Sequence, residues 1–116
     1  MKTKAVISFK DRTNRKIVDI LIDKKGYLDK IGKFLKKKIL NRKTENINKF
    51  AFSLINDLRK KVGQCYLYAP IKDYDKKLYY FDEYEADYYY EIDSNFYIRC
   101  WDTISNKEEI IYYKGR

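Results

Sequence analysis

Apolar residues recur along the chain with two different periods, and the change of period divides the sequence into elements. The segments Lys4–Lys10 and Lys16–Ile22 are short and rich in β-branched residues, which is typical of strands. Between them lies Asp11–Asn14, a polar turn of four residues. Because so short a connection leaves room for little else, we expect the two strands to form a hairpin.

Two segments in the middle of the chain show helical spacing. In Leu28–Leu40 the apolar positions fall on one stripe, and in Ile47–Val62 they form a continuous apolar face. Thr44 or Asn46 can cap the second segment, and Gly63 is a natural stop. Both segments are therefore predicted to be helices with one face directed at a core.

The rest of the chain is strand-like. Four strands are expected after the helices, at Cys65–Tyr68, Tyr84–Ile92, Phe96–Asp102 and Glu108–Tyr113. The segment Ile71–Glu83 is ambiguous between a strand and a surface loop. The order ββ-αα-ββββ predicts an α+β fold in which an antiparallel sheet carries both helices on one face. A length of 116 residues fits a single domain over residues 1–116.

The second predicted hairpin has two chemically different faces. A three-residue loop, Asp93–Asn95, pairs Ile92 with Phe96 and Tyr90 with Ile98, which gives an apolar face for the helices. The opposite face is expected to be open to solvent. It combines charged and aromatic side chains, among them Tyr89, Tyr97, Arg99 and Trp101.

The net charge of +9 is distributed unevenly along the chain. Residues 1–64 carry 19 basic and 6 acidic side chains, whereas residues 65–116 carry 7 basic and 11 acidic side chains. This asymmetry favours a basic side that meets an anionic partner. A general solubility charge is the alternative interpretation.

The basic side is expected on the outer faces of the helices. At about 100° per residue, three lysines of the first helix point away from its apolar stripe, and two cations and one aromatic residue do so on the second. These residues are Lys30, Lys33, Lys37, Phe52, Arg59 and Lys60. Such a layer suits phosphate contact with base stacking, or contact with a nucleoprotein. The alternative is a solvated face with Phe52 packed under a loop.

The sequence carries no recognisable catalytic machinery. It contains no His, which removes the commonest general base and metal ligand, and it has no phosphate-binding or nucleophile motif. Cys65 and Cys100 match no metal spacing and are expected to be buried thiols. The acidic residues between Asp82 and Asp93 lack the spacing of a calcium loop and are expected to form a solvated strand. We therefore expect no enzyme, no cofactor and no metal.

The ends and the apolar runs of the chain bear on its location. The first residues are not expected to form a signal peptide, and no apolar run approaches the ~18 residues that cross a bilayer. Two widely spaced cysteines fit reduced thiols in a cytosol. The expectation is a cytoplasmic protein without a membrane partner.

Four segments in fixed order resemble a family of short uncharacterised proteins found in bacterial genomes and phages. They are Asp23–Leu35 (DKKGYLDKIGKFL), Cys65–Pro70 (CYLYAP), Tyr88–Asp93 (YYYEID) and Tyr97–Asp102 (YIRCWD). The resemblance spans about residues 5–102 and assigns no activity and no functional residue. It implies a mobile-element setting, in which small proteins often inhibit host defences, as anti-CRISPR proteins do.

Two functions remain as expectations. The first is a non-enzymatic inhibitor that blocks a host defence protein or nucleoprotein, for example a CRISPR effector. Its protein contacts would be Tyr89, Tyr97, Arg99 and Trp101, because Tyr and Trp are good interface anchors. The alternative for these tyrosines is that they simply fill a sheet. The second function is direct RNA or DNA binding through the basic helical face.

Overall fold

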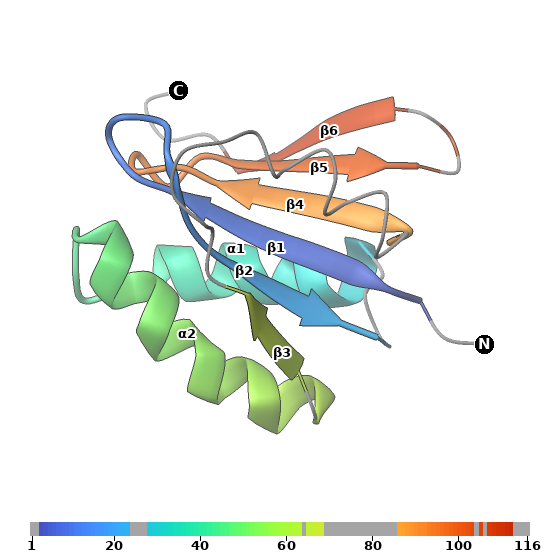
Figure 1. Ribbon diagram of the computed structural model, residues 1–116, viewed down its shortest axis with the longest axis horizontal. Helices are drawn as coiled ribbons and strands as arrows, with labels where there is room; N and C mark the ends of the chain where they lie inside the picture. Colours follow the sequence, from blue (N-terminus) through green and yellow to red (C-terminus); the bar gives the residue numbers. More distant parts are fainter. Residues whose placement is uncertain are drawn as a thin grey trace.

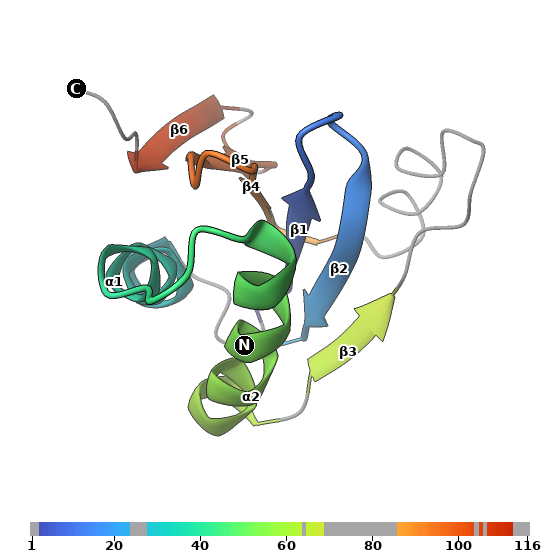
Figure 2. The ribbon, with the colours of Figure 1, turned by 90° about the vertical axis from the view of Figure 1, so that its left-hand side faces the viewer.

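The computed structural model describes residues 3–23, 28–63, 65–68, 86–103, 105 and 107–112. In this part of the chain six strands form one mixed sheet in the order β3-β2-β1-β4-β5-β6. The strands are β1 Ala5–Lys10, β2 Lys16–Ile22, β3 Cys65–Tyr68, β4 Tyr88–Ile92, β5 Ile98–Asp102 and β6 Lys107–Tyr112. The helices are the π-helical turn η1 Leu28–Gly32, α1 Lys33–Leu40 and α2 Ile47–Val62. Both α-helices lie on the same side of the sheet (Figures 1 and 2).

The α+β class and the two helices on one face are confirmed, but the purely antiparallel sheet is wrong. β4 runs parallel to β1, with Ala5 opposite Tyr88 and Phe9 opposite Ile92. The apolar run of β1 is buried on both faces, as is typical of a strand inside a parallel pairing. Local patterns do not encode strand direction. The helices and two strands between β1 and β4 make a connection long enough for a parallel crossover.

Helix α2 begins and ends where the sequence predicts. The side chain of Asn46 accepts a hydrogen bond from the Lys49 backbone N–H at 3.1 Å, which satisfies one of the first free donors of the helix. At the other end Gly63 adopts a φ of +84° and donates its N–H to the carbonyl of Arg59. In the described residues, no helix is both long and apolar enough to cross a membrane.

The first helix departs from the prediction in its first turn. Leu28–Gly32 forms a wide π-helical turn, and the regular α-helix begins only at Lys33. Gly32, a poor helix former, lies where the wide turn changes into the α-helix. The buried stripe nevertheless stays continuous, because Ile31, Leu35 and Ile39 are all fully buried.

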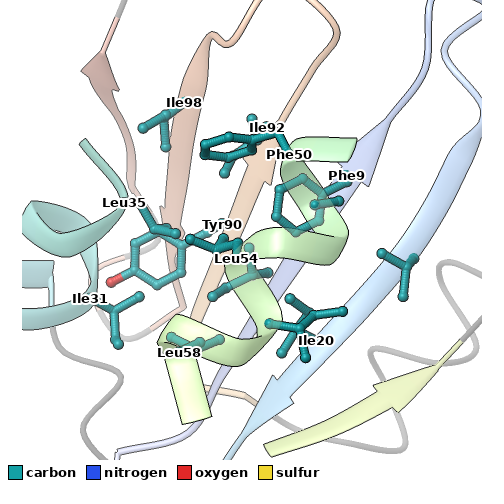
Figure 3. Close-up of a cluster of buried hydrophobic side chains, with 14 of the residues drawn as sticks. Phe9, Ile20, Ile31, Leu35, Phe50, Leu54, Leu58, Tyr90, Ile92 and Ile98 are labelled. Carbon is teal, nitrogen blue, oxygen red and sulfur yellow. The ribbon is translucent and has the colours of Figure 1, made fainter. Parts of the chain in front are cut away.

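One hydrophobic core fills the space between the helices and the sheet. Figure 3 shows Leu54 and Leu58 of α2 in the same cluster of buried side chains as Ile20 of β2. Phe50 makes edge-to-face contacts with Phe9 at 6.3 Å and Phe96 at 5.2 Å between ring centroids. The seven positions of α2 that form its predicted apolar face are all buried. The predicted core face of the helix is therefore confirmed.

Both hairpins close through the same type of five-residue loop. In the first loop the Asp11 carboxylate accepts hydrogen bonds from the backbone N–H groups of Thr13 and Arg15, and Asn14 has a φ of +66°. A further hydrogen bond from the Thr13 hydroxyl, the largest cause, lowers the pKa of the Asp11 carboxyl from its usual value. The carboxylate thus fixes a turn that holds β1 and β2 in register.

The second loop repeats this arrangement and corrects the predicted register. Asp93 accepts from the backbone N–H groups of Asn95 and Tyr97, and Phe96 has a φ of +62°. Ile92 therefore pairs with Ile98 rather than with Phe96. Because this shift is two residues, each side chain keeps its predicted face of the sheet.

Candidate binding surfaces

The helical segment carries most of the net positive charge of the chain. Residues 28–63 contain eleven Lys and Arg side chains against three Asp and Glu, and the net charge of the whole chain is +9. Eight exposed cations of η1, α1 and α2 define what we call the basic helical surface. They are Lys30, Lys33, Lys36, Lys37, Lys49, Arg59, Lys60 and Lys61.

The five cations that the sequence singles out for this surface are all exposed, as predicted. They are Lys30, Lys33, Lys37, Arg59 and Lys60. Across the described ranges, none of these side chains takes part in an ion pair or a side-chain hydrogen bond. Their charges are therefore left to solvent ions, which a phosphate-bearing partner can displace.

Neighbouring cations differ because they support the fold. The Lys38 ammonium lies 3.0 Å from the Asp57 carboxylate and links α1 to α2. The Arg42 guanidinium donates to the carbonyl of Ile39 at 2.8 Å and covers the Phe96 ring at 4.2 Å from its centroid. Exposed cations and structural cations are thus separate groups within the helical layer.

Two large apolar side chains are exposed in the same layer. Phe52 of α2 is 57% exposed, in agreement with its predicted outward direction. Leu40 at the end of α1 is exposed to the same extent and was missed by the sequence analysis. Its signal was available, because a residue five positions after Leu35 is rotated about 140° from the buried stripe. Phe52 and Leu40 are apolar contact points beside the lysines.

The sheet face that points away from the helices is buried around β1 and β2. Val6, Leu21 and Ala86 form a second buried cluster there, with Tyr89 packed against it. Cross-strand neighbours Ser8 and Asp19 are also buried. The open face was predicted for the second hairpin alone, and the neighbouring part of the same sheet face, around β1 and β2, is buried. Among the described residues the face is more open towards β5 and β6, where Trp101 is 38% exposed and the Glu108 side chain 48%.

A groove of about 420 Å³ lies on this second face. Residues of four strands contribute to its lining, which consists of Ser8, Lys10, Tyr89, Tyr90, Glu91, Arg99, Trp101 and Glu108. The Glu91 carboxylate lies 2.7 Å from the Lys10 ammonium through Oε1 and is paired with the Arg99 guanidinium through Oε2. The Glu108 carboxylate is 3.8 Å from Arg99. The groove combines a charged floor with two aromatic side chains.

The structure brings together three of the four predicted protein-contact residues. Tyr89 and Trp101 are direct cross-strand partners and line the groove with Arg99. Tyr97 belongs instead to the five-residue loop, and its ring lies 5.6 Å from the Arg99 guanidinium. The corrected register places Arg99 opposite Glu91, where the sequence analysis expected Tyr97.

Two buried oxygen atoms on the second face have unmet hydrogen-bonding capacity. Within the described residues, Ser8 Oγ and Asp19 Oδ1 have no hydrogen-bond partner. Asp19 is the charged member of this pair, and its other oxygen binds the Lys16 ammonium at 2.8 Å. Sequence reasoning missed both residues, although each is a lone polar residue within an apolar strand. That interruption was the available signal.

The acidic run and the cysteines have structural roles where they are described. Asp87 accepts a hydrogen bond from the Lys4 backbone N–H, Asp93 fixes a turn and Glu91 lies in the groove. The acidic residues at positions 82, 83 and 85 lie outside the described residues. Cys65 and Cys100 are both buried thiols, as expected.

Comparison of the chain with protein-family models, with curated proteins and with solved structures gives no match. The resemblance to short phage and bacterial proteins therefore stays a prediction.

Proposed function

We propose that the protein is a non-enzymatic binding protein whose basic helical surface contacts the phosphates of a nucleic acid, either free or held in a nucleoprotein. The observation that carries this proposal is the group of exposed cations that have no acidic partner among the described residues. Lys30, Lys33 and Lys37 follow one another at intervals of three and four residues. Lys33 and Lys37 lie four residues apart on one side of α1, and Lys30 is an exposed residue of the turn η1 that precedes it. The three ammonium groups can follow one phosphate backbone.

Phe52 supports the same proposal. Its exposed ring lies on the helix that carries Arg59 and Lys60. Single-stranded nucleic acids bind to proteins through cations that follow the backbone and aromatic rings on which bases stack. A charge that served solubility alone would not require an exposed Phe beside it.

The biological setting that we propose is inhibition of a host defence system that handles nucleic acids, in the manner of an anti-CRISPR protein. The support for this setting is the resemblance to short phage and bacterial proteins, together with the basic surface. A defence nucleoprotein exposes phosphates of its guide or target strand, and a small basic protein can cover them. Additional protein contacts through Tyr89, Tyr97, Arg99 and Trp101 stay a prediction.

The test measures binding of labelled single-stranded RNA and duplex DNA by fluorescence anisotropy over a range of salt concentrations. Log affinity should fall with log salt at a slope of about −0.7 to −0.9 per phosphate contact. The triple variant Lys30→Glu, Lys33→Glu, Lys37→Glu should lose binding at moderate salt. Any binding that persists at low salt should show a slope reduced by roughly three contacts.

A matched control separates local contact from total charge. The variant Arg12→Glu, Arg15→Glu, Lys107→Glu changes three exposed cations outside the helices. Its net charge equals that of the helical triple variant. It should keep most of the affinity. A folded helical triple variant that binds like the unmodified protein contradicts the proposal, and so does an equal loss in the control.

A further inference from the structure

The groove on the second sheet face has the size and lining of a small-molecule site. Its volume of about 420 Å³ falls within the ~300–1,000 Å³ of typical ligand pockets. It opens on the side of the sheet opposite the helices, so it is separate from the basic helical surface. We propose that this groove binds a small planar aromatic ligand that carries an anionic group, either a carboxylate or a phosphate.

The floor of the groove has spare hydrogen-bond donors. Both oxygens of Glu91 are engaged, one by Lys10 and the other by Arg99. An ammonium group has three donors and a guanidinium group has five, so both cations keep donors beyond those bound to Glu91. The complement of such a floor is a group rich in acceptors, and an anionic group meets this need with charge-assisted hydrogen bonds.

Ser8 gives an independent indication of a ligand. Its side chain lines the groove although the residue is only 2% exposed, and Oγ has no hydrogen-bond partner within the described part of the chain. A buried hydroxyl without a partner costs free energy, which an incoming oxygen atom recovers. Ser8 is therefore placed to bind the same anionic group as Lys10.

The aromatic side chains account for the planar part of the ligand. Among the described residues of this face, Trp101 is the large apolar side chain that is exposed. Tyr89 is its cross-strand partner. The Tyr89 hydroxyl accepts a hydrogen bond from the Ala86 backbone N–H at 3.1 Å, which fixes the ring in place. An aromatic ring of the ligand can pack against these side chains while its anionic group reaches the floor.

Glu108 is the group that opposes an anionic ligand. Its carboxylate lies 3.8 Å from the Arg99 guanidinium and its side chain is 48% exposed, so the pairing is loose and lies at the rim. An anionic ligand must compete with this carboxylate for Arg99. Removing the charge of Glu108 should therefore strengthen binding, which gives a variant with an effect opposite to that of the others.

The experiment uses Trp101, the one tryptophan of the chain, as a fluorescence reporter. The complete probes are adenosine monophosphate, which joins a heterocycle to a phosphate, and benzoate, which joins a ring to a carboxylate. Adenosine and inorganic phosphate are the incomplete probes. At least one complete probe should quench Trp101 saturably and bind about tenfold or more tightly than the incomplete probes, a difference of one charged hydrogen bond. The responding probe identifies the source of the anionic group.

Substitutions test the assignment of the floor. Lys10→Met should weaken binding of the responding probe about tenfold or more, and Ser8→Ala roughly fivefold. Glu108→Gln should tighten binding of the anionic probe severalfold and leave adenosine unaffected. Lys43→Gln, an exposed residue between the helices, should have no effect. Ser8→Ala removes a buried hydroxyl group that has no hydrogen-bond partner in the described part of the chain, so this variant should fold normally. It remains informative if Lys10→Met does not fold.

Three results would overturn the proposal. The first is that neither adenosine monophosphate nor benzoate changes the Trp101 emission or the chemical shift of its indole N–H. The second is tight binding by inorganic phosphate alone, which would make the aromatic ring irrelevant. The third is unchanged affinity in a folded Ser8→Ala variant, which would place the ligand elsewhere.

Discussion

Asp19 is a carboxylate buried inside the sheet with a lysine against one of its oxygens. Its side chain is 1% exposed, and Lys16 contacts Oδ2 at 2.8 Å. Burying a charge costs free energy unless the charge is paired. The folded state therefore tolerates the buried Asp19 carboxylate because the Lys16 ammonium is present. Removing the lysine alone leaves the buried Asp19 carboxylate without the Lys16 ammonium.

Lys16→Met should therefore destabilise the protein by about 3–5 kcal/mol. The double variant Lys16→Met, Asp19→Asn carries no buried charge and should recover at least about half of this loss. Lys43→Met, at an exposed position, should change stability by less than about 0.5 kcal/mol. Urea denaturation of the four proteins measures these differences. A Lys16→Met variant as stable as the Lys43→Met control would show that the Asp19 charge is stabilised by other groups.

At the scale of elements, the two hairpin loops have the same backbone conformation, but only the first has a sequence that is typical of it. Each loop starts with Asp and has its fourth residue in the left-handed region. Asn14 is a common residue at such a position, whereas a bulky Phe is costly there by about 1–2 kcal/mol. Phe96 accepts this conformation because its ring is buried against Phe50 and under Arg42. Core packing outweighs local preference at this residue.

This balance predicts an inverted order of stability at position 96. Phe96→Ala and Phe96→Gly both lose the core contacts, at a cost of about 3–5 kcal/mol. Only glycine relieves the left-handed backbone, so Phe96→Gly should be about 1 kcal/mol more stable than Phe96→Ala. Glycine is normally the less stable of the two. At position 14, Asn14→Gly should change stability by less than about 0.5 kcal/mol. Chemical denaturation measures the free energy of unfolding of each variant. A Phe96→Ala variant that is more stable than Phe96→Gly contradicts the strain argument.

The same contrast explains which parts of the fold could be predicted. Ile47–Val62 was found with its bounds, because a cap, a stop and a seven-residue buried face all agree. The direction of β4 was not found, because side-chain patterns fix the face of a strand and not its polarity. The register error of two residues came from Phe96, whose backbone conformation depends on tertiary packing. It kept every face correct, since the side-chain period of a strand is two.

The two candidate surfaces differ in the same way. Exposure of Lys33 and Lys37 depends on the phase of α1, which the sequence determines, and Lys30 is exposed as well although its π-helical turn was not predicted. The groove depends on β1 lying beside β4, which brings Lys10 and Ser8 of one strand to Glu91 of the other. Lys10 and Ser8 lie 81 and 83 positions before Glu91 in the chain, and no local pattern links them. The groove could therefore be recognised only once the pairing of β1 with β4 was known.

At the scale of the whole molecule, the sheet separates two surfaces of different charge. The helical side has cations with no acidic partner in the described part of the chain, whereas the groove on the other side balances Lys10 and Arg99 against Glu91 and Glu108. The core between them is continuous with both helices and with β1, β4 and β5. Each surface can therefore be altered by substitution of exposed residues without removing core contacts, and the two proposed activities can be tested separately.

The concentration of positive charge on the helices should also be visible in stability. Like charges three or four residues apart on a helix destabilise it by about 0.2–0.5 kcal/mol per pair, and salt screens this repulsion. Added salt should therefore stabilise the unmodified protein while it weakens nucleic-acid binding. The variant Lys30→Glu, Lys33→Glu, Lys37→Glu lowers the net charge and should be as stable as the unmodified protein, or up to about 1 kcal/mol more stable, at low salt.

Thermal melting over a range of salt concentrations measures this effect. The stability curves of the two proteins should converge at high salt, where repulsion is screened within a few ångströms. Folding and binding thus respond to salt in opposite directions, so a variant that loses binding through unfolding can be recognised. A triple variant that is clearly less stable than the unmodified protein at low salt would show that the lysines support the fold, and their loss could then no longer be interpreted as loss of a phosphate contact.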